Sequence, residues 1–579
     1  MSRRLRISIG QHSDRGVKDT NQDFHGAMIP DEPTLTLKGI AIAIADGISS
    51  SSVSRVASES AVKAFLTDYY CTSDAWTVKT SVHRVLAASN SWLHAETRRS
   101  RWAHDRDKGY VCTFSGLVLK SATAHLFHVG DSRIQRLVGQ SLEQLTEDHR
   151  LVVSSEQSYL ARALGMDRDV EIDHRVVPLA RGDVFLLTTD GVHDHIDARF
   201  VAETIAANAD DLDAAARAII AEALARGSTD NLTIQIVRID DLPEGDAAEV
   251  MGKATQLPLP PLLRARQVFD GYRIERQIHA SSRSHIYLAT DLDTDQLVAL
   301  KIPSIDCRDD AVYLKRFMME DWVARRLDSP HVLKPVPATR PRHYLYIVTE
   351  WVDGQTLAQW MTDHPTPDLE TVRGIVEQIA KGLRAFHRKE MLHQDLRPAN
   401  VMIDRTGTVK IIDFGSTRVA GVIEAAPDLD ATDVLGTAPY TAPEYYLGEG
   451  GTNRSDLYSL GVIAYHMLTG RLPFGTKVAA ARTRAAQRSL VYASALDDER
   501  DIPVWVDEVL RRAVVVDPNQ RFEVLSEFTH ELRHPTTTRP GGGTRPLVER
   551  NPLRFWQITA LLLLIADVAQ LLLSFRGRH

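Results

Sequence analysis

The segment from His393 to Gly415, which reads HQDLRPANVMIDRTGTVKIIDFG, constrains the fold of this chain more than any other stretch. Two mostly apolar runs rich in β-branched residues, Val401–Ile403 and Val409–Ile412, flank a Thr-Gly break. This pattern predicts a loop followed by a β-hairpin. Three polar residues stand at the edges of the hairpin: Asp395, Asn400 and Asp413.

These three polar residues suit the transfer of a phosphoryl group. A carboxylate beside an incoming hydroxyl can accept its proton, while an amide oxygen and a second carboxylate can hold Mg²⁺ across phosphate oxygens. A buried hairpin whose aspartates cap turns is the alternative interpretation. The joint match over 23 positions disfavours that alternative.

The segment resembles the catalytic loop and the metal loop of eukaryotic-like Ser/Thr protein kinases. The resemblance implies that Asp395 orients or deprotonates the substrate hydroxyl and that Asn400 and Asp413 hold Mg²⁺. Arg397 stands near the γ-phosphate, where these kinases usually have Lys, and it keeps the positive charge. Gln394 replaces a common Arg that pairs with a phosphate on the activation loop, so activation by loop phosphorylation is less strongly required.

Length and composition bound the rest of the chain. With 579 residues it is too long for one hydrophobic core, and we expect two to four domains. The formal net charge of −8 argues against a nucleic-acid-binding protein, because a basic surface is missing. The three cysteines are isolated and odd in number, which indicates a reducing compartment and no thiolate metal site.

Residues 1–240 place four aspartates next to apolar runs. Asp46, Asp131 and Asp190 each follow such a run, and Asp230 precedes another. Strands that end at one rim would bring these carboxylates together, where they repel one another unless cations lie between them. All-oxygen ligands favour Mg²⁺ or Mn²⁺ over zinc, and two such ions could activate a shared water for hydrolysis of a phosphate ester.

Residues 5–238 resemble the metal-dependent protein phosphatase (PPM) family of phosphoserine/phosphothreonine phosphatases. The motifs that carry the resemblance are Gly16–Asp23, Ala45–Gly47, Val129–Arg133, Leu145–His149, Ala161–Gly165, Gly182–Gly191 and Asp230–Asn231. A turn is the ordinary interpretation of a single Asp-Gly pair, but the ordered motifs together disfavour it for the set.

The phosphatase resemblance implies a fold and a ligand set. The fold is an α/β/β/α sandwich of two antiparallel sheets, and the helical stretches Ser54–Tyr70 and Val78–Arg98 fit its outer layer. Asp46, Asp190 and Asp230 would hold the first metal ion. Asp46 and the carbonyl of Gly47 would hold the second, and Asp131 would support a weaker third.

The sequence departs from this family at two positions. Lys18 stands where an Arg usually binds the substrate phosphate, and Lys lacks the bidentate fork, so we expect weaker phosphate binding. Gln22 replaces an acidic residue, and a neutral amide oxygen is a poorer metal ligand. His12 and His149 are candidate general acids, although each is more often a surface or turn histidine.

Residues 241–268 are predicted to be a linker and residues 269–534 a kinase domain. Val298–Lys301 reads as a strand that ends in the phosphate-pairing Lys301, whose expected partner is Glu320 in the helical run Tyr313–Leu327. The kinase resemblance also implies an adenine-binding hinge. Its residues are Thr349 on the inner wall, followed by Glu350 and Val352.

The ATP loop is the largest departure from the kinase pattern. His279, Ser281 and Ser284 replace the three glycines that let the backbone approach the phosphates. We therefore expect ATP to be held more loosely unless the Ser hydroxyls or Arg283 compensate.

The activation segment is expected over Ser416–Glu444. Its candidate phosphoacceptors are Thr432, Thr437 and Thr441, and Thr437 has a structural role as the alternative. Asp456 would brace the catalytic loop. Arg521 would pair with Glu444.

The C-terminal end combines a polar linker with an apolar segment. Residues 535–554 read as a disordered linker, and residues 555–575 are long and apolar enough to be a transmembrane helix. Asp567 lies within this segment, and placing its charge in a bilayer would cost roughly 3 kcal/mol. An in-plane amphipathic helix or a dimerisation helix is the alternative. A single-pass anchor would leave both catalytic domains in the cytoplasm.

Taken together, the sequence predicts a multidomain α+β protein: a PPM-type sandwich, a bilobal protein-kinase fold and a transmembrane helix. The expected function is that of a bifunctional Ser/Thr kinase and phosphatase, with ATP and with Mg²⁺ or Mn²⁺ in both domains. Protein and phosphoprotein substrates are expected, including the chain's own activation segment. The alternative is an active phosphatase with a regulatory, nucleotide-binding pseudokinase domain. The sequence predicts no oligomeric state.

Overall fold

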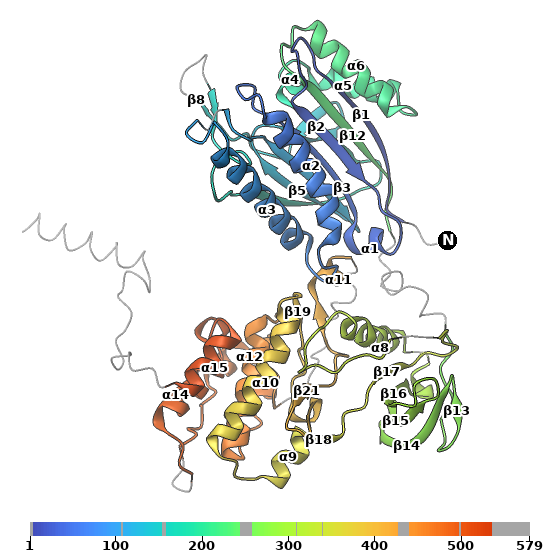
Figure 1. Cartoon of the computed structure of the whole chain (residues 1–579), viewed down its shortest axis with the longest axis vertical. Coiled ribbons are helices and arrows are strands. Elements are labelled where there is room, and N and C mark those ends of the chain that lie inside the picture. The colour runs from blue at the N-terminus through green and yellow to red at the C-terminus, as the bar shows by residue number, and fades with distance from the viewer. Residues whose placement is uncertain are drawn as a thin grey trace, which may run out of the picture. The chain divides into compact units, whose positions relative to one another are not determined.

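The computed structural model describes residues 4–105, 108–152, 158–243, 257–308, 310–337, 340–425, 439–496 and 500–534. Figure 1 shows the chain with its helices and strands labelled. We refer to residues 4–243 as the N-terminal sandwich and to residues 257–534 as the bilobal part.

The N-terminal sandwich contains two five-stranded antiparallel sheets. The first has the order β1 (Arg6–Asp14), β12 (Leu232–Asp241), β11 (Val184–Thr188), β6 (Arg133–Val138), β7 (Ser141–Gln144). The second has the order β10 (Asp173–Pro178), β5 (Thr123–Val129), β4 (Phe114–Lys120), β3 (Ile40–Asp46), β2 (Asp23–Met28). A short hairpin, β8 (Arg150–Val152) and β9 (Ser158–Leu160), stands outside both sheets.

Helices cover the outer faces of the two sheets (Figure 1). They are α2 (Ser54–Cys71), α3 (Val78–Arg99), α4 (Asp190–His193), α5 (Ala198–Ala207) and α6 (Leu212–Ala225), while the short helix α1 (Thr34–Lys38) precedes β3 and packs against the core between the sheets. The helices α2 and α3 agree with the two helical stretches that the sequence predicts. The α/β/β/α order of the predicted sandwich is therefore present.

The alternation of residues in β3 explains how these layers fit together. Its isoleucines at 40, 42 and 44 belong to the core between the two sheets, while its alanines at 41, 43 and 45 pack against α2 and α3. Successive side chains of a strand point to opposite faces, so large residues fill the space between the sheets. The small alanines let the helices approach closely.

The bilobal part begins with the five-stranded sheet β13 (Val268–Phe269), β14 (Tyr272–Ala280), β15 (Ser284–Asp291), β16 (Leu297–Pro303), β17 (Ile347–Glu350). Helix α8 (Ala311–Ala324) accompanies this sheet. It starts two residues before the predicted helix, because the Asp310 side chain accepts a hydrogen bond from the backbone N–H of Tyr313 and caps it.

The second lobe is mostly helical. Its helices are α9 (Leu357–Asp363), α10 (Leu369–His387), α11 (Ala420–Ala425), α12 (Asn453–Thr469), α13 (Arg484–Arg488), α14 (Val504–Ala513) and α15 (Leu525–Arg533). The predicted hairpin is β20 (Val401–Asp404) and β21 (Val409–Ile411), joined by β18 (Gly354–Thr356). A second small ladder pairs β19 (Met391–Leu392) with β22 (Arg418–Val419).

Part of the predicted linker packs against the first lobe. Leu257 and Leu259 contact a cluster that includes Phe317 of α8, and the carbonyl of Pro258 accepts a hydrogen bond from Leu345 N–H at 3.0 Å. Both leucines are partly buried in this contact, so the Leu-Pro run packs against the lobe as well as connecting the two domains. Residues 244–256 lie outside the described part of the chain.

The predicted transmembrane helix at 555–575 also lies outside the described residues. Within the part that is described, none of the helices combines the length and the apolar character needed to cross a membrane.

The second lobe contains the predicted ion pair between Arg521 and Glu444. Both side chains are buried, with 0% and 5% exposed, and two guanidinium nitrogens each donate to one carboxylate oxygen at 2.8 Å. Removing one partner of a buried pair leaves the other charge without compensation.

We therefore expect Arg521→Met to lower the free energy of unfolding of the second lobe by about 3–5 kcal/mol. The measurement is hydrogen exchange of peptides from α12 and α14 in increasing urea. Arg484→Met is the matched control, because Arg484 forms an exposed pair with Glu449 and should contribute little. Equal stability of the two variants would contradict this prediction.

Candidate active sites

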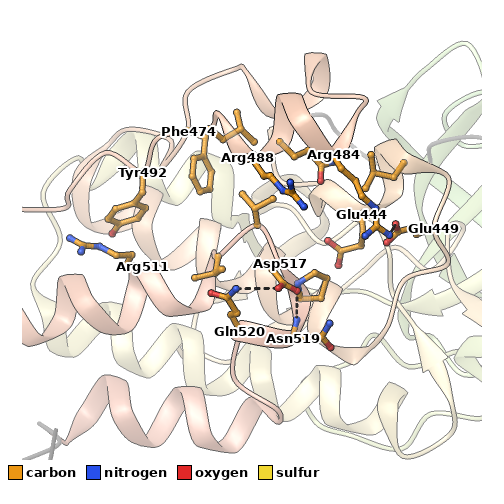
Figure 2. A pocket seen from close by; sticks show the side chains of 16 residues that line it. Glu444, Glu449, Phe474, Arg484, Arg488, Tyr492, Arg511, Asp517, Asn519 and Gln520 are labelled. Atoms are coloured by element: carbon orange, nitrogen blue, oxygen red, sulfur yellow. Dashed lines mark hydrogen bonds and ion pairs between the residues drawn. The ribbon is translucent and has the colours of Figure 1, made fainter. Parts of the chain in front are cut away.

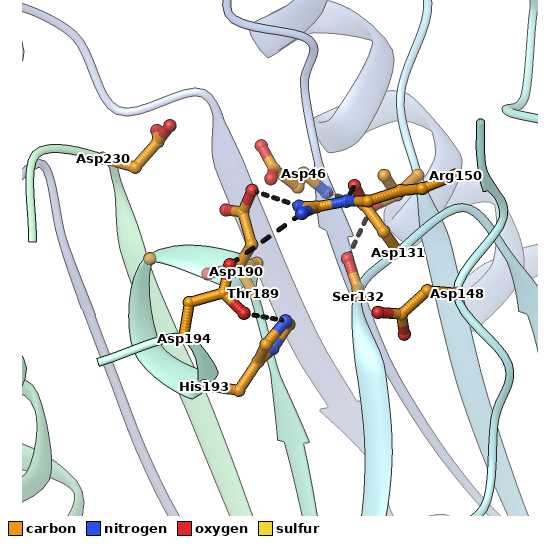
Figure 3. Close-up of polar contacts among 12 residues, drawn as sticks. Asp46, Asp131, Ser132, Asp148, Arg150, Thr189, Asp190, His193, Asp194 and Asp230 are labelled. Atoms are coloured by element: carbon orange, nitrogen blue, oxygen red, sulfur yellow. Dashed lines mark hydrogen bonds and ion pairs between the residues drawn. The ribbon is translucent and has the colours of Figure 1, made fainter. Parts of the chain in front are cut away.

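The aspartates predicted at strand ends meet at one rim of the N-terminal sandwich (Figure 3). Burial and the neighbouring Asp23, Asp190 and Asp131 raise the pKa of Asp46 well above its usual range. Burial, with the charges of Asp131 and Asp230, raises the pKa of Asp190 to about 7. These shifts show that the carboxylates are close enough to repel one another.

Asp23 belongs to the same cluster, although the sequence analysis did not assign it a role. It lies opposite Asp46 in the β2–β3 ladder and is only 6% exposed. The hydroxyls of Thr189 and Thr233 both donate to its Oδ2 atom, at 2.9 and 2.7 Å. Asp23 is the last residue of the Gly16–Asp23 motif, and this position in the motif could have identified it as a member of the cluster.

Arg150 links two carboxylates of the cluster, and nothing in the sequence pattern indicated it. Its Nε atom donates to Asp131 Oδ2 at 2.6 Å, and one terminal nitrogen donates to Asp190 Oδ2 at 2.9 Å. Figure 3 shows the guanidinium between the two aspartates. Arg150 is the first residue of β8, so the hairpin outside the sheets carries this cation to the rim.

Lys18 supplies a second cation. Its Nζ atom contacts Asp230 and donates to the hydroxyl of Ser49 at 2.7 Å. The side chain predicted to bind a substrate phosphate is therefore paired with a predicted metal ligand in this structure.

A divalent cation fits the chemistry of this cluster. The donors are carboxylates, and Asp190 Oδ1 is buried with no hydrogen-bond partner among the described residues. However, no group of three or more His, Cys, Asp or Glu side chains in the described ranges is positioned to hold a metal ion. Arg150 and Lys18 already pair with three of the predicted ligands, Asp131, Asp190 and Asp230. The predicted set, including the Gly47 carbonyl, remains a prediction.

Gln22 has a structural role. Its amide nitrogen donates to the carbonyl of Ser51 at 2.7 Å and to the hydroxyl of Ser54 at 2.6 Å. These bonds tie the first motif to the start of α2. Gly47 lies against the same turn, where an added Cβ would come within 2.7 Å of the Ser54 backbone.

The two candidate histidines differ in position. His149 is buried, and its Nδ1 atom accepts a hydrogen bond from Gly130 N–H at 3.0 Å. Its Nε2 atom lies 3.0 Å from Asp173 Oδ2. Both ring nitrogens are thus engaged, which favours the structural interpretation. His12 lies within β1, opposite Ile234.

In the bilobal part, the predicted pairing of Lys301 with Glu320 is present. Lys301 Nζ donates to the two Glu320 oxygens at 2.8 and 2.6 Å and lies 3.8 Å from Asp413 Oδ1. Burial opposes the charge of Lys301, but the Asp413 and Glu320 carboxylates outweigh it and raise the lysine pKa. Burial also opposes the charge of Asp413, and Lys301 more than compensates, so the pKa of Asp413 falls.

The catalytic loop holds Asp395 through Asn400. The Asn400 side-chain nitrogen donates to the Asp395 carbonyl at 2.9 Å and to its Oδ2 atom at 3.0 Å. Arg397 Nε lies 3.5 Å from the same carboxylate oxygen. Asn400 therefore uses its amide nitrogen to orient Asp395, and its side-chain oxygen does not take part in these bonds.

Asp456 braces this loop, as the sequence predicts. Its carboxylate accepts hydrogen bonds from the backbone N–H groups of His393 and Gln394, both at 3.0 Å. Gln394 has a φ of +65°, a conformation that is costly for a non-glycine residue. The buried carboxylate thus compensates a strained backbone beside Asp395.

The glycine-free ATP loop is closed by a serine. The Ser281 hydroxyl accepts hydrogen bonds from the backbone N–H groups of Ser284 and Arg283, at 3.0 and 3.3 Å, and donates to the Ser284 carbonyl at 3.1 Å. The Arg283 guanidinium lies over the ring of Tyr313. Ser281 therefore stabilises the hairpin tip where the kinase pattern has glycine.

At the predicted hinge, Glu350 is bonded to other parts of the protein, and its own backbone N–H donates to the Lys334 carbonyl at 2.9 Å. The Glu350 carboxylate accepts from Lys334 N–H at 2.9 Å and from Lys410 Nζ at 2.7 Å, so it is engaged within the protein. Thr349 lies opposite Ala299 of β16. Val352 follows two residues after the strand and is 5% exposed.

Two of the candidate phosphoacceptors, Thr432 and Thr437, lie outside the described residues. Thr441 is only 2% exposed.

A separate cavity of about 710 Å³ lies in the second lobe (Figure 2). Three arginines line it together with aromatic residues: Arg484, Arg488, Arg511, Phe474 and Tyr492. None of the residues predicted to bind ATP or metal is among its lining residues. This cavity is therefore distinct from the sites described above.

Comparison with known proteins matches both parts of the chain. Residues 11–226 match the family model of protein phosphatase 2C, and residues 272–535 match that of the protein kinase domain. The chain joins a protein phosphatase 2C domain to a protein kinase domain.

Among curated relatives, the serine/threonine-protein kinase PrkC of Bacillus subtilis (strain 168) is 29% identical over 273 residues, covering 47% of this chain and 41% of PrkC. PknA of Corynebacterium glutamicum is 36% identical over 208 residues, covering 35% of this chain and 44% of PknA. The matches thus span less than half the length of these relatives.

Solved structures are similar to each domain. The catalytic domain of the serine threonine protein phosphatase PstP, in complex with two manganese ions, is 23% identical with a TM-score of 0.34, covering 41% of this chain and 99% of that one. The Mycobacterium tuberculosis PknI kinase domain is 27% identical with a TM-score of 0.35, covering 47% of this chain and 99% of that one.

Arg150→Gln should increase the affinity of the phosphatase domain for Mn²⁺ by about tenfold, because the carboxylates lose a competing charged hydrogen-bond donor. Isothermal titration of the full chain without nucleotide measures this effect. Arg136→Gln is the control, since Arg136 pairs with Glu143 on β7. Weaker Mn²⁺ binding by the Arg150 variant would show instead that Arg150 supports the metal site.

Ser281→Ala should weaken ATP binding to the kinase domain by about two- to tenfold, the worth of a few neutral hydrogen bonds at the loop tip. Equilibrium binding of a fluorescent ATP analogue in the presence of Mg²⁺ measures the change. The neighbouring Ser282→Ala variant serves as the control and should bind normally. Unchanged binding in both variants would mean that the hydroxyl of Ser281 does not organise the loop for ATP.

Proposed function

We propose that this protein is a bifunctional enzyme that phosphorylates protein serine and threonine residues and also hydrolyses phosphoserine and phosphothreonine. One observation supports the proposal: the Lys301–Glu320 ion pair and a rim of clustered aspartates occur in the two matched domains of a single chain. ATP is the proposed phosphoryl donor, and Mg²⁺ or Mn²⁺ is the proposed metal ion in both domains.

In the kinase domain, Asp395 is the proposed catalytic base. It would accept the proton of the substrate hydroxyl as that oxygen bonds to the γ-phosphorus, the bond to the bridging oxygen breaks and ADP leaves. The bond from Asn400 orients the Asp395 carboxylate for this role. Arg397, beside the same carboxylate, is placed to offset negative charge on the transferred group.

Nucleotide binding in the kinase domain divides among three groups. Lys301, held by Glu320, would pair with ATP phosphates. The Asn400 side-chain oxygen and Asp413, whose depressed pKa keeps it ionised, would hold the metal ion. Backbone groups of Glu350 and Val352, beside Thr349, would pair with the adenine base.

In the phosphatase domain, Asp46, Asp190 and Asp230, with the Gly47 carbonyl and Asp131, would hold the metal ions. Bound metal would supply an activated water for attack on the phosphate ester. Lys18 would then be released from Asp230 and would bind the substrate phosphate. A single ammonium gives this contact less geometric specificity than a guanidinium would.

Fusion of the two domains raises the effective concentration of each site for the products of the other. We propose that the phosphatase acts on phosphates placed by the kinase, including those on its own activation segment. Anchoring of the chain by the apolar segment 555–575, with the catalytic domains in the cytoplasm, is part of the proposal. Its support is the sequence of that segment.

The decisive experiment is incorporation of labelled phosphate from ATP into the Asp46→Asn protein, in which phosphate removal is disabled. We expect incorporation, and we expect the additional substitution Asp395→Asn to reduce it at least about 100-fold, as loss of a catalytic base does. The matched control is Asp363→Asn, an exposed carboxylate at the end of α9. It should leave incorporation unchanged.

Absence of incorporation with either metal would reduce the kinase domain to a nucleotide-binding regulatory module. The phosphatase is tested separately, by release of phosphate from a phosphothreonine peptide with Mn²⁺. That release should disappear in Asp46→Asn or after chelation. Persistence of the release in the Asp46→Asn protein would contradict the proposed phosphatase site.

A further inference from the structure

The phosphatase domain makes several polar contacts with the kinase domain. The phosphatase side consists of Asp74–Val78 and Thr80, in the connection from α2 to α3 and the first turn of α3, together with Lys120. We call these residues the docking surface. They contact three places in the kinase domain: the end of α8, the turn before β19, and α11.

Lys120 is the centre of this surface. It is the last residue of β4 and is 1% exposed, and its Nζ atom donates to the Gly421 carbonyl at 2.7 Å and to Glu424 Oε2 at 3.2 Å. A buried ammonium is costly unless it is paired and hydrogen-bonded. Its bonding partners among the described residues both belong to α11 of the kinase domain, so burial of Lys120 depends on that helix.

Gly421 shows how closely α11 approaches. Its backbone N–H donates to the Ala75 carbonyl at 3.0 Å. A Cβ atom at this position would lie 2.6 Å from the Trp76 carbonyl oxygen and 2.7 Å from that of Ala75. Only glycine lets the two backbones meet at this distance without displacement.

Two glutamates of the kinase domain complete the N-terminus of α3. Glu424 Oε2 accepts from Val78 N–H at 2.9 Å. Glu390 accepts from Thr77 N–H and from the Thr80 hydroxyl, both at 2.6 Å. Carboxylates at a helix N-terminus satisfy free N–H groups and the helix dipole. The two domains therefore meet through complementary groups, with N–H groups and Lys120 of the phosphatase domain facing carboxylates of the kinase domain.

The docking surface also reaches α8, the helix that carries Glu320. Arg326, two residues beyond the end of α8, makes a bidentate ion pair with Asp74, with its closest contact at 2.7 Å. Its guanidinium lies over the ring of Trp322 on α8. Meanwhile α11 directly follows β22, whose pairing with β19 orders the chain after Asp413. The surface thus contacts the chain directly after α8, which carries Glu320, and the helix that follows the Asp413 segment.

We propose that the phosphatase domain acts as a fixed docking platform that stabilises the catalytic arrangement of the attached kinase domain, independently of its own phosphatase chemistry. By binding α11 and the end of α8 together, it favours the state in which Lys301 pairs with Glu320. The consequence for catalysis rests on the proposed kinase function, whereas the docking itself does not.

The test compares hydrogen exchange in the full chain carrying Asp46→Asn, with and without Lys120→Met. Methionine fits the buried space but cannot bond to Gly421 or Glu424. Exchange in residues 418–425 and in α8 should rise at least about fivefold, the usual lower range of coupling between sites. Exchange in β3 and β11 should not change, which shows that the phosphatase domain remains folded. Lys79→Met, an exposed lysine of α3, is the matched control.

Glu424→Gln provides a second variant from the kinase side, in case Lys120→Met does not fold. It should raise exchange in the same peptides. Unchanged exchange in residues 418–425 and α8 in both variants would overturn the proposal.

Labelled-phosphate incorporation in the same proteins tests the catalytic consequence. It should fall at least about fivefold in Lys120→Met and stay constant in Lys79→Met. Equal or faster incorporation in Lys120→Met would overturn the stabilising role and indicate an inhibitory contact. If the parent protein shows no incorporation, the kinase function fails, and the exchange data alone decide whether the platform exists.

Discussion

A charge removed from water requires a partner, and this constraint organises the sites of both domains. Lys301 is partly buried beside Glu320 and Asp413, and Arg521 is fully buried against Glu444. In the phosphatase domain the excess is negative, and Arg150 approaches two of the clustered aspartates. Lys120 of the phosphatase domain follows the same rule, because its partner is Glu424 of the kinase domain. Each of these pairs ties together elements that are distant in the sequence.

The two sites satisfy the constraint in opposite ways. The kinase site pairs its buried lysine with carboxylates of the same domain, so its geometry is set before nucleotide binds. The phosphatase rim concentrates carboxylates whose pKa values are raised by burial and by one another, as at Asp46 and Asp190. Such a rim is best stabilised by added cations, which is the property that a metal-dependent hydrolase requires.

Much of this could be predicted from the sequence because the informative residues are local. The apolar run that ends at Asp46 predicts a strand, and the Thr-Gly break predicts the hairpin after Asp395. The pairing of Lys301 with Glu320, the brace from Asp456 and the pair of Arg521 with Glu444 were predicted from motif positions and are present. Gln22 was interpreted as a weak metal ligand, but its amide anchors the turn before α2.

The sequence by itself determined the two domains, their order and the residue types of both sites, because strand periodicity and motif spacing depend only on residues that are close together in the sequence. Only the tertiary structure decided which charges meet. The contact of Arg150 with Asp131 and Asp190, and of Lys120 with Glu424, depends on how separate elements pack. Packing brings together residues that are 19, 40 and 304 positions apart in these pairs, and no local pattern records such distances.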